Sequence, residues 1–171
     1  DSDPEWTMNG FTLSEDSDRA FAIAIGPDLG ELESYTISVE AWSGGYYNNA
    51  LGIVFAYQDE DNMMLLLWDD FNGFYGDYSP DGEIELWEVS GGTWTQSASD
   101  DDSDDYIMDY GTWTDLSLSV DGSEISFSAD GSTYFQHSYT GATPLGADHI
   151  GVFSYDNDQG ITFDDFEVTQ P

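Results

Sequence analysis

The chain has 171 residues and carries 36 Asp and Glu side chains against a single Lys or Arg, so its formal net charge is −35. This balance excludes nucleic acids and anionic membranes as partners, because both are recognised through basic patches. Aromatic residues make up 16% of the chain and cysteine is absent, which excludes a disordered acidic segment and a fold held by disulfides.

The length predicts one domain over residues 1–171, large enough for a core between two sheets. No signal peptide opens the chain at Asp1, and we expect the domain to come from a longer extracellular protein. Two compatible interpretations of the acidity stay open. One is a surface suited to saline water, where salt screens like charges. The other is bound Ca²⁺, which takes carboxylate and carbonyl oxygens as ligands.

The first third of the chain predicts three strands. Trp6–Leu13 and Ala20–Ile25 are short apolar segments separated by an acidic connection. Tyr35–Trp42 alternates strictly, with Tyr35, Ile37, Val39 and Ala41 on one face. That alternation is typical of a strand with one buried face. Its outer face carries Trp42, which we interpret as a functional residue.

The middle of the chain predicts a hairpin at the centre of the core. Ala50–Tyr57 and Met63–Trp68 are apolar at nearly every position and are joined by the acidic segment Gln58–Asn62. Short, continuously apolar runs bounded by turn residues indicate strands that are buried on both faces.

The rest of the chain predicts further hairpins around glycine-containing turns such as Asp121-Gly122 and Asp130-Gly131. The predicted strands are Glu83–Val89, Thr93–Ser97, Trp113–Val120, Glu124–Ala129, Thr133–His137, His149–Tyr155 and Ile161–Val168. About a dozen short strands without a helix predict an all-β fold, an antiparallel two-sheet β-sandwich of the jelly-roll type.

The last strand changes parity in its interior. Ile161 and Phe163 share one face, whereas Phe166 and Val168 share the other. A β-bulge at Asp164-Asp165 would bring both pairs onto the core face and turn one carboxylate out of the regular pleat. The alternative is an ordinary strand with Asp165 on its outer face.

Four of these segments carry a resemblance to a known family. Leu51–Gln58 followed by Met63–Trp68, and the closing pair His149–Ser154 and Ile161–Phe166, resemble the thrombospondin C-terminal type of the concanavalin A-like, laminin G-like sandwich superfamily. The abundance of Asp and the absence of Lys resemble modules of large calcium-dependent bacterial adhesins. These resemblances imply a secreted or cell-surface location in a saline habitat, with neighbouring adhesin domains.

Several Asp groups have spacings that suit Ca²⁺. Asp100, Asp102 and Asp104 match the first three ligands of a calcium loop, but Asp105 and Gly111 break the EF-hand pattern. A looser calcium loop and a solvated charge run both stay open. The predicted metal ligands are Asp59, Asp61, Asp69, Asp70, Asp100, Asp102, Asp104, Asp156, Asp158 and Asp164.

These ligands imply at least two separate sites. Asp59 and Asp61 precede the strand Met63–Trp68, whereas Asp69 and Asp70 follow it. At the rise of a β-strand the two groups are about 20 Å apart, which is too far for one ion.

An enzyme is a weaker interpretation. Glu83–Glu88 resembles the Glu-x-Asp-x-x-Glu catalytic strand of laminarinase-like glycoside hydrolases, with Glu85 in place of the central Asp. That chemistry needs paired carboxyl groups about 5 Å apart on one face. The alternative is a plain alternating strand with Ile84 and Leu86 inward, and we therefore expect no catalytic activity.

Aromatic residues in loops complete the set of candidates. A flat ring for stacking beside carboxylates is typical of a surface that binds sugars or peptides. The predicted ligand-binding residues are Trp42, Tyr46, Tyr47, Asp69, Asp70, Tyr75 and Tyr78. The sequence thus predicts a lectin-like, calcium-dependent adhesion module that binds a glycan or peptide on another cell. The alternatives are a laminarinase-like hydrolase and a structural adhesin spacer without a ligand.

Overall fold

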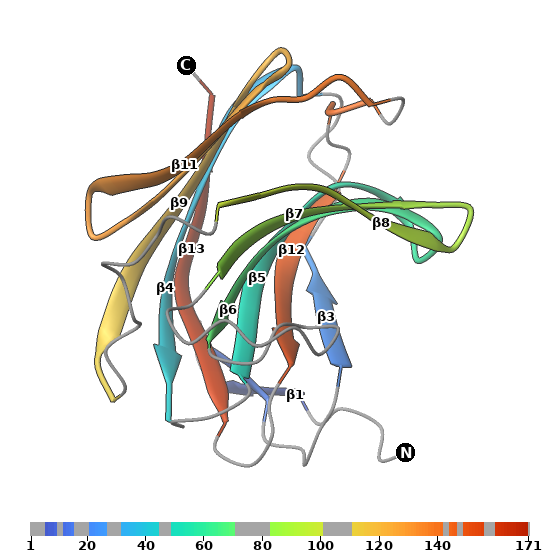
Figure 1. Cartoon of the computed structure of the whole chain (residues 1–171). Helices are drawn as coiled ribbons and strands as arrows, with labels where there is room; N and C mark the ends of the chain where they lie inside the picture. The colour runs from blue at the N-terminus through green and yellow to red at the C-terminus, as the bar shows by residue number, and fades with distance from the viewer. Residues whose placement is uncertain are drawn as a thin grey trace.

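The computed structural model describes residues 6–9, 12–15, 21–26, 32–44, 49–70, 83–100, 111–141, 144–146, 149–155 and 160–170. These ranges form thirteen strands in two antiparallel sheets that face each other (Figure 1). This arrangement confirms the predicted all-β, two-sheet sandwich. Within the described ranges, no helix has the length and apolar character that a bilayer span requires.

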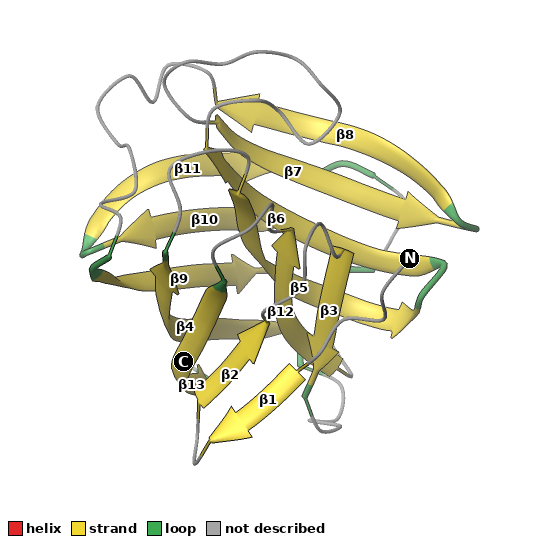
Figure 2. Cartoon of the chain, turned by 90° about the horizontal axis from the view of Figure 1, so that it is seen from below, coloured by secondary structure: helices red, strands yellow, loops and turns green. Residues whose placement is uncertain are grey.

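The first sheet has seven strands, in the order β1 (Trp6–Asn9), β2 (Thr12–Glu15), β13 (Ile161–Thr169), β4 (Ser34–Ser43), β9 (Trp113–Asp121), β10 (Glu124–Ala129) and β11 (Ser132–Ser138). The second sheet has six, in the order β3 (Phe21–Ile25), β12 (His149–Tyr155), β5 (Asn49–Asp59), β6 (Asn62–Asp70), β7 (Glu83–Ser90) and β8 (Thr93–Asp100). Figure 2 shows the two layers from below. Each sheet therefore has one face toward the other sheet and one outer face.

The segment predicted as one strand over Trp6–Leu13 is two strands. β1 and β2 pair antiparallel, with Trp6 opposite Glu15 and Asn9 opposite Thr12. The prediction was wrong because it gave no weight to Asn9-Gly10, a dipeptide that favours a tight turn between two strands.

The core between the sheets follows the predicted alternation of β4. Tyr35, Ile37 and Val39 are buried there, and Thr36 and Ser38 on the opposite face are only partly buried. The Tyr35 hydroxyl donates a hydrogen bond to the Leu145 carbonyl oxygen at 3.0 Å. Burial raises the pKa of this hydroxyl, and a hydrogen bond with the Ala56 backbone partly offsets the rise.

The hairpin β5–β6 is buried on both faces, as its apolar runs predict. On the inner face, residues such as Ile53 and Leu66 belong to the main core. On the outer face, Val54 and Leu65 belong to a second apolar cluster that includes Phe153 of β12. Gly52 lies where β5 and β6 approach closely, since a Cβ there would collide with the carbonyl oxygen of Leu66.

The last strand contains the predicted bulge. Asp164 pairs with Glu40 and Glu167 pairs with Ser38, so two residues of β13 lie opposite the single intervening residue of β4. Asp165 has a φ of 49°, in the left-handed region. The bulge returns Val168 to the core, where it packs against buried residues.

Phe166 does not follow Val168 to the core, and its side chain is 38% exposed. It is the second of the two residues that oppose one residue of β4. The irregular backbone at Asp165 therefore directs the phenyl ring outward. The expectation that both apolar pairs would face the core was right for Val168 and wrong for Phe166.

Candidate functional site

The outer face of the seven-stranded sheet is polar because β4, β9 and β10 all alternate. Strand pairing places the outward hydroxyl groups in rows across the sheet. Thr36 lies opposite Ser119, and their hydroxyl oxygens are 2.8 Å apart. In the next row Ser38 lies opposite Ser117, which in turn lies opposite Ser128. The result is an open face that can offer several hydroxyl donors and acceptors to a ligand.

A row of carboxylates follows the hydroxyl rows. Glu40 of β4 lies directly opposite Asp164 of β13 on one side and Asp115 of β9 on the other. The bulge adds Asp165 beside them. At the other end, the Asp115 backbone N–H donates to Oδ1 of Asp130 in the β10–β11 turn, at 3.0 Å. We call Glu40, Asp115, Asp164 and Asp165 the acidic row.

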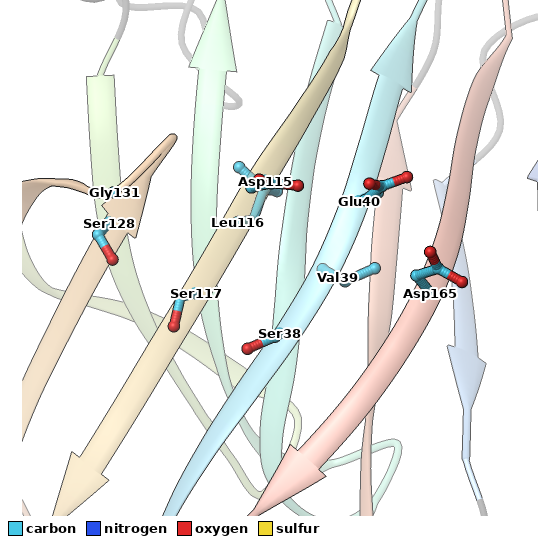
Figure 3. Close-up of a pocket in the computed structure, with 9 residues that line it drawn as sticks. All are labelled: Ser38, Val39, Glu40, Asp115, Leu116, Ser117, Ser128, Gly131 and Asp165. Carbon is cyan, nitrogen blue, oxygen red and sulfur yellow. The ribbon is translucent and has the colours of Figure 1, made fainter.

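These polar groups surround a hollow of about 470 Å³. Figure 3 shows Glu40 between Asp115 and Asp165, with the serines at neighbouring positions of the same strands. The residues that line the hollow are Ser38, Val39, Glu40, Asp115, Leu116, Ser117, Ser128, Gly131 and Asp165. Five different segments thus contribute to one concave, hydroxyl- and carboxylate-rich surface.

The acidic row is electrostatically unbalanced. Partial desolvation raises the pKa of Glu40, and the negative charges of Asp165, Asp115 and Asp164 raise it further. The only Lys or Arg of the chain is Arg19, which lies outside the described residues. Within the described part of the chain, no lysine or arginine therefore offsets the row.

Two tryptophans lie beside the acidic row. Trp42 pairs directly with Trp113, two residues along the strands from the pair Glu40–Asp115 and therefore on the same face of the sheet. Trp113 is 46% exposed and Trp42 is partly buried. The pair thus lies next to the acidic row, on the side away from the hydroxyl rows, and neither tryptophan is among the residues that line the hollow.

Sequence reasoning missed the serines of the hollow as well as Trp113, Glu40, Asp115 and Asp165. One signal was available, because Trp113 has the outward parity of its own alternating strand, as Trp42 does. The neighbourhood itself depends on the pairing of β4 with β9 and β13, which are distant in the sequence.

The predicted calcium ligands that have described side chains lie in different places. Asp59 and Asp61 occupy the β5–β6 turn, where Asp59 Oδ1 accepts hydrogen bonds from the Asp61 N–H at 3.0 Å and Asn62 Nδ2 at 2.8 Å. Asp100 ends β8, and Asp164 belongs to the acidic row. Among the described residues, no three acidic or histidine side chains are placed to hold one metal ion.

The other predicted site residues are described in part or not at all. Asp69 and Asp70 are described only as backbone at the end of β6, opposite Ala50 and Asn49. They lie at the other end of β6 from the Asp59–Asp61 turn, which agrees with the predicted separation. The residues outside the described ranges are Tyr46, Tyr47, Tyr75, Tyr78, Asp102, Asp104, Asp156 and Asp158.

The strand that resembles a hydrolase motif has a different geometry. Ile84 and Leu86 are in the core, which agrees with the plain alternating interpretation. Glu85 is only 5% exposed, and its two carboxylate oxygens accept hydrogen bonds from Trp87 Nε1 at 2.9 Å and Gln96 Nε2 at 2.8 Å. A catalytic carboxylate must contact its substrate, whereas the Glu85 carboxylate is buried and already accepts two hydrogen bonds.

No family model and no curated protein matches this chain. Solved structures that share its fold include the carbohydrate binding module CBM66 from Bacillus subtilis, with a TM-score of 0.68, 10% identity, and coverage of 98% of this chain and 92% of that one. For sheep galectin-11 the TM-score is 0.57 and the identity 11%, with coverage of 90% and 98%.

A GH43 protein from Bacillus licheniformis has a TM-score of 0.54 and 12% identity; the match covers 98% of this chain but only 38% of that one. At such identities the likeness concerns the fold alone. It agrees with the concanavalin A-like, jelly-roll type of sandwich that the sequence predicts.

Proposed function

We propose that this protein is a glycan-binding recognition module, and that its ligand lies on the outer face of the seven-stranded sheet. The observation that carries the proposal is the pairing of Trp42 with the exposed Trp113 next to the acidic row. Sugar rings combine an apolar face with a rim of hydroxyl groups. A surface for them therefore needs an aromatic ring for stacking and polar groups for orientation.

The polar groups are present within reach of one ligand. The acidic row can accept hydrogen bonds from sugar hydroxyls, and the serine hydroxyls can both donate and accept. The fold neighbours add support, because one of them is described as a carbohydrate binding module and another as a galectin.

We further propose that the protein binds Ca²⁺ and that it acts in cell adhesion. A formal charge of −35 on one domain produces strong self-repulsion, which bound Ca²⁺ would relieve. The Asp groups predicted from sequence, apart from Asp164 of the acidic row, would hold the ions in acidic segments. A site that binds only the folded state adds about 2.7 kcal/mol of stability at 100 times its dissociation constant. The module would then belong to a secreted or cell-surface adhesin and bind glycans of another cell.

A glycan array with the purified protein tests the binding proposal. We expect binding to at least one glycan and its loss in Trp42→Ala, with the wild-type circular dichroism spectrum preserved. Silence on the array would contradict glycan binding and favour a structural spacer. An unchanged profile for Trp42→Ala would place the ligand elsewhere.

The calcium proposal needs a separate control for salt. We expect a chelator to lower the melting temperature and reduce glycan binding, and Ca²⁺ to restore both. NaCl at matched ionic strength should not restore them. An equal response to NaCl would leave only the interpretation of a surface suited to saline water.

We propose no glycoside hydrolase activity, because the enclosure of Glu85 removes one of the three carboxylates of the hydrolase-like strand from contact with a substrate. Release of reducing sugar from a panel of β-glucans by the wild-type protein, lost in Glu83→Gln, would overturn this assignment.

A further inference from the structure

The proposed glycan site carries negative charge that the described part of the protein does not neutralise. Glu40 lies between Asp115 and Asp164 in direct cross-strand register, with Asp165 beside them. Like charges directly opposite each other destabilise a sheet. The fold nevertheless gathers them beside an open hollow. A ligand that brings positive charge would relieve this repulsion.

One metal ion does not match the layout of these carboxylates. In the described part of the chain, no three acidic side chains surround a common point. The row instead crosses three neighbouring strands, β13, β4 and β9. Adjacent strands are about 4.8 Å apart, so the row extends over about 10 Å. Charge spread over that length complements a ligand that carries several cationic groups along its chain.

The neighbouring groups indicate that the cationic groups belong to a sugar. The exposed ring of Trp113 can stack on a sugar ring, and aromatic faces also attract ammonium groups. The serines of the hollow supply hydrogen bonds for hydroxyls on the same ligand. A glycan with carboxylate or sulfate groups would instead meet like charge at close range, which costs affinity.

We propose that this surface selects glycans that carry protonated amino groups, of which an oligomer of glucosamine is the simplest, over their N-acetylated and acidic counterparts. This inference rests on the proposed function. It adds that charge complementarity at the acidic row, and not stacking alone, decides which glycan binds.

Titration calorimetry on the intact chain tests the proposal with three oligomers of equal length: glucosamine, N-acetylglucosamine and a uronic acid. The measurements use one ionic strength and a pH at which the amine is protonated. We expect glucosamine to bind at least about tenfold more tightly than N-acetylglucosamine, and the uronic acid not to bind. The double variant Glu40→Gln/Asp165→Asn should abolish most of that preference.

A matched variant separates the site from the overall charge of the chain. Glu33→Gln/Glu60→Gln removes the same number of charges from two exposed positions outside the row and should preserve the preference. An equal loss in both double variants would overturn the proposal, because attraction to the net charge would then explain the binding. Equal or tighter binding of a lysine-rich peptide would overturn it too, in favour of a protein partner.

The failure of this inference is distinguishable from that of the proposed function. Equal affinity for the glucosamine and N-acetylglucosamine oligomers would overturn the amine preference and leave glycan binding in place. Binding of neutral array glycans, with none of the three oligomers bound, would have the same meaning. Absence of binding to every glycan would overturn both.

Discussion

The two outer faces of this sandwich differ sharply, although each belongs to a sheet whose inner face lines the same core. On the six-stranded sheet, the outer side chains of Val54, Leu65 and Leu67 are fully buried. On the seven-stranded sheet, the corresponding positions carry Ser, Thr and carboxylates around an open hollow. A continuously apolar strand thus produces a face that must be covered, and an alternating strand produces a face that is free to bind.

The same contrast governs the carboxylates. Glu85, on the outer face of the six-stranded sheet, is enclosed and accepts hydrogen bonds from two neutral donors. Glu40, on the other outer face, has its pKa raised by partial desolvation and by the like charges around it. Burial of a carboxylate is tolerated where donors satisfy it, whereas an open cluster of carboxylates is balanced by a ligand or by solvent ions.

The largest effect is expected from a substitution that disrupts the tight packing of the six-stranded sheet. Gly52→Ala should destabilise the protein by about 3 kcal/mol or more, because its Cβ would collide with the Leu66 carbonyl between two central strands. Urea denaturation measures the change. Ser38→Ala, on the outer face of the other sheet, should change stability by less than about 0.5 kcal/mol. Similar losses for both would contradict the contrast between the faces.

The next largest loss of stability is expected when a buried carboxylate with two hydrogen bonds is replaced. In Glu85→Gln the new amide group replaces one acceptor with a donor, so the N–H of Trp87 or Gln96 loses its partner. We expect a loss of about 1–3 kcal/mol in the free energy of unfolding. Thermal unfolding that matches the wild type would show that these hydrogen bonds contribute nothing.

A smaller gain is expected in the core. The Ser154 hydroxyl is fully buried and makes no hydrogen bond with any described residue. Ser154→Ala should raise the free energy of unfolding by about 1 kcal/mol, since it removes an unsatisfied polar group from the interior. A destabilised variant in the same urea titration would mean that the hydroxyl has a partner in solution.

The smallest effect concerns the acidic row and depends on pH. The pKa of Glu40 is raised in the folded state above its ordinary value of 4.5, so the native state retains this proton longer than the unfolded state. Below that pH Glu40 is protonated in both states and costs no stability. As pH rises through the folded pKa, the native state must ionise Glu40 and loses stability relative to the unfolded state. Glu40→Gln should slightly raise the melting temperature at neutral pH and leave it unchanged in acid. The opposite sign would contradict repulsion within the row.

Much of the fold could be predicted because it is encoded locally. The doubly apolar hairpin β5–β6, the turn Asp130-Gly131 and the bulge at Asp164-Asp165 each follow from a few consecutive residues. The division of Trp6–Leu13 was also encoded locally, in Asn9-Gly10.

Most of the candidate site could not be predicted in this way. The outward direction of Trp42 follows from the alternation of its strand. Its neighbours Trp113 and Asp115 come from a strand about seventy residues later in the chain, and the register that aligns them is set by packing of the whole sheet. The acidic row is likewise a product of three strands, which no local spacing of Asp residues revealed.

The central claim is that glycans bind the open face of the seven-stranded sheet. Its most direct test compares Trp113→Ala on that face with Trp94→Ala, which removes a partly exposed tryptophan from the outer side of the six-stranded sheet. Calorimetric affinity for the tightest array glycan should fall about tenfold in Trp113→Ala and stay unchanged in folded Trp94→Ala. Unchanged affinity in Trp113→Ala, or a loss confined to Trp94→Ala, would contradict the claim.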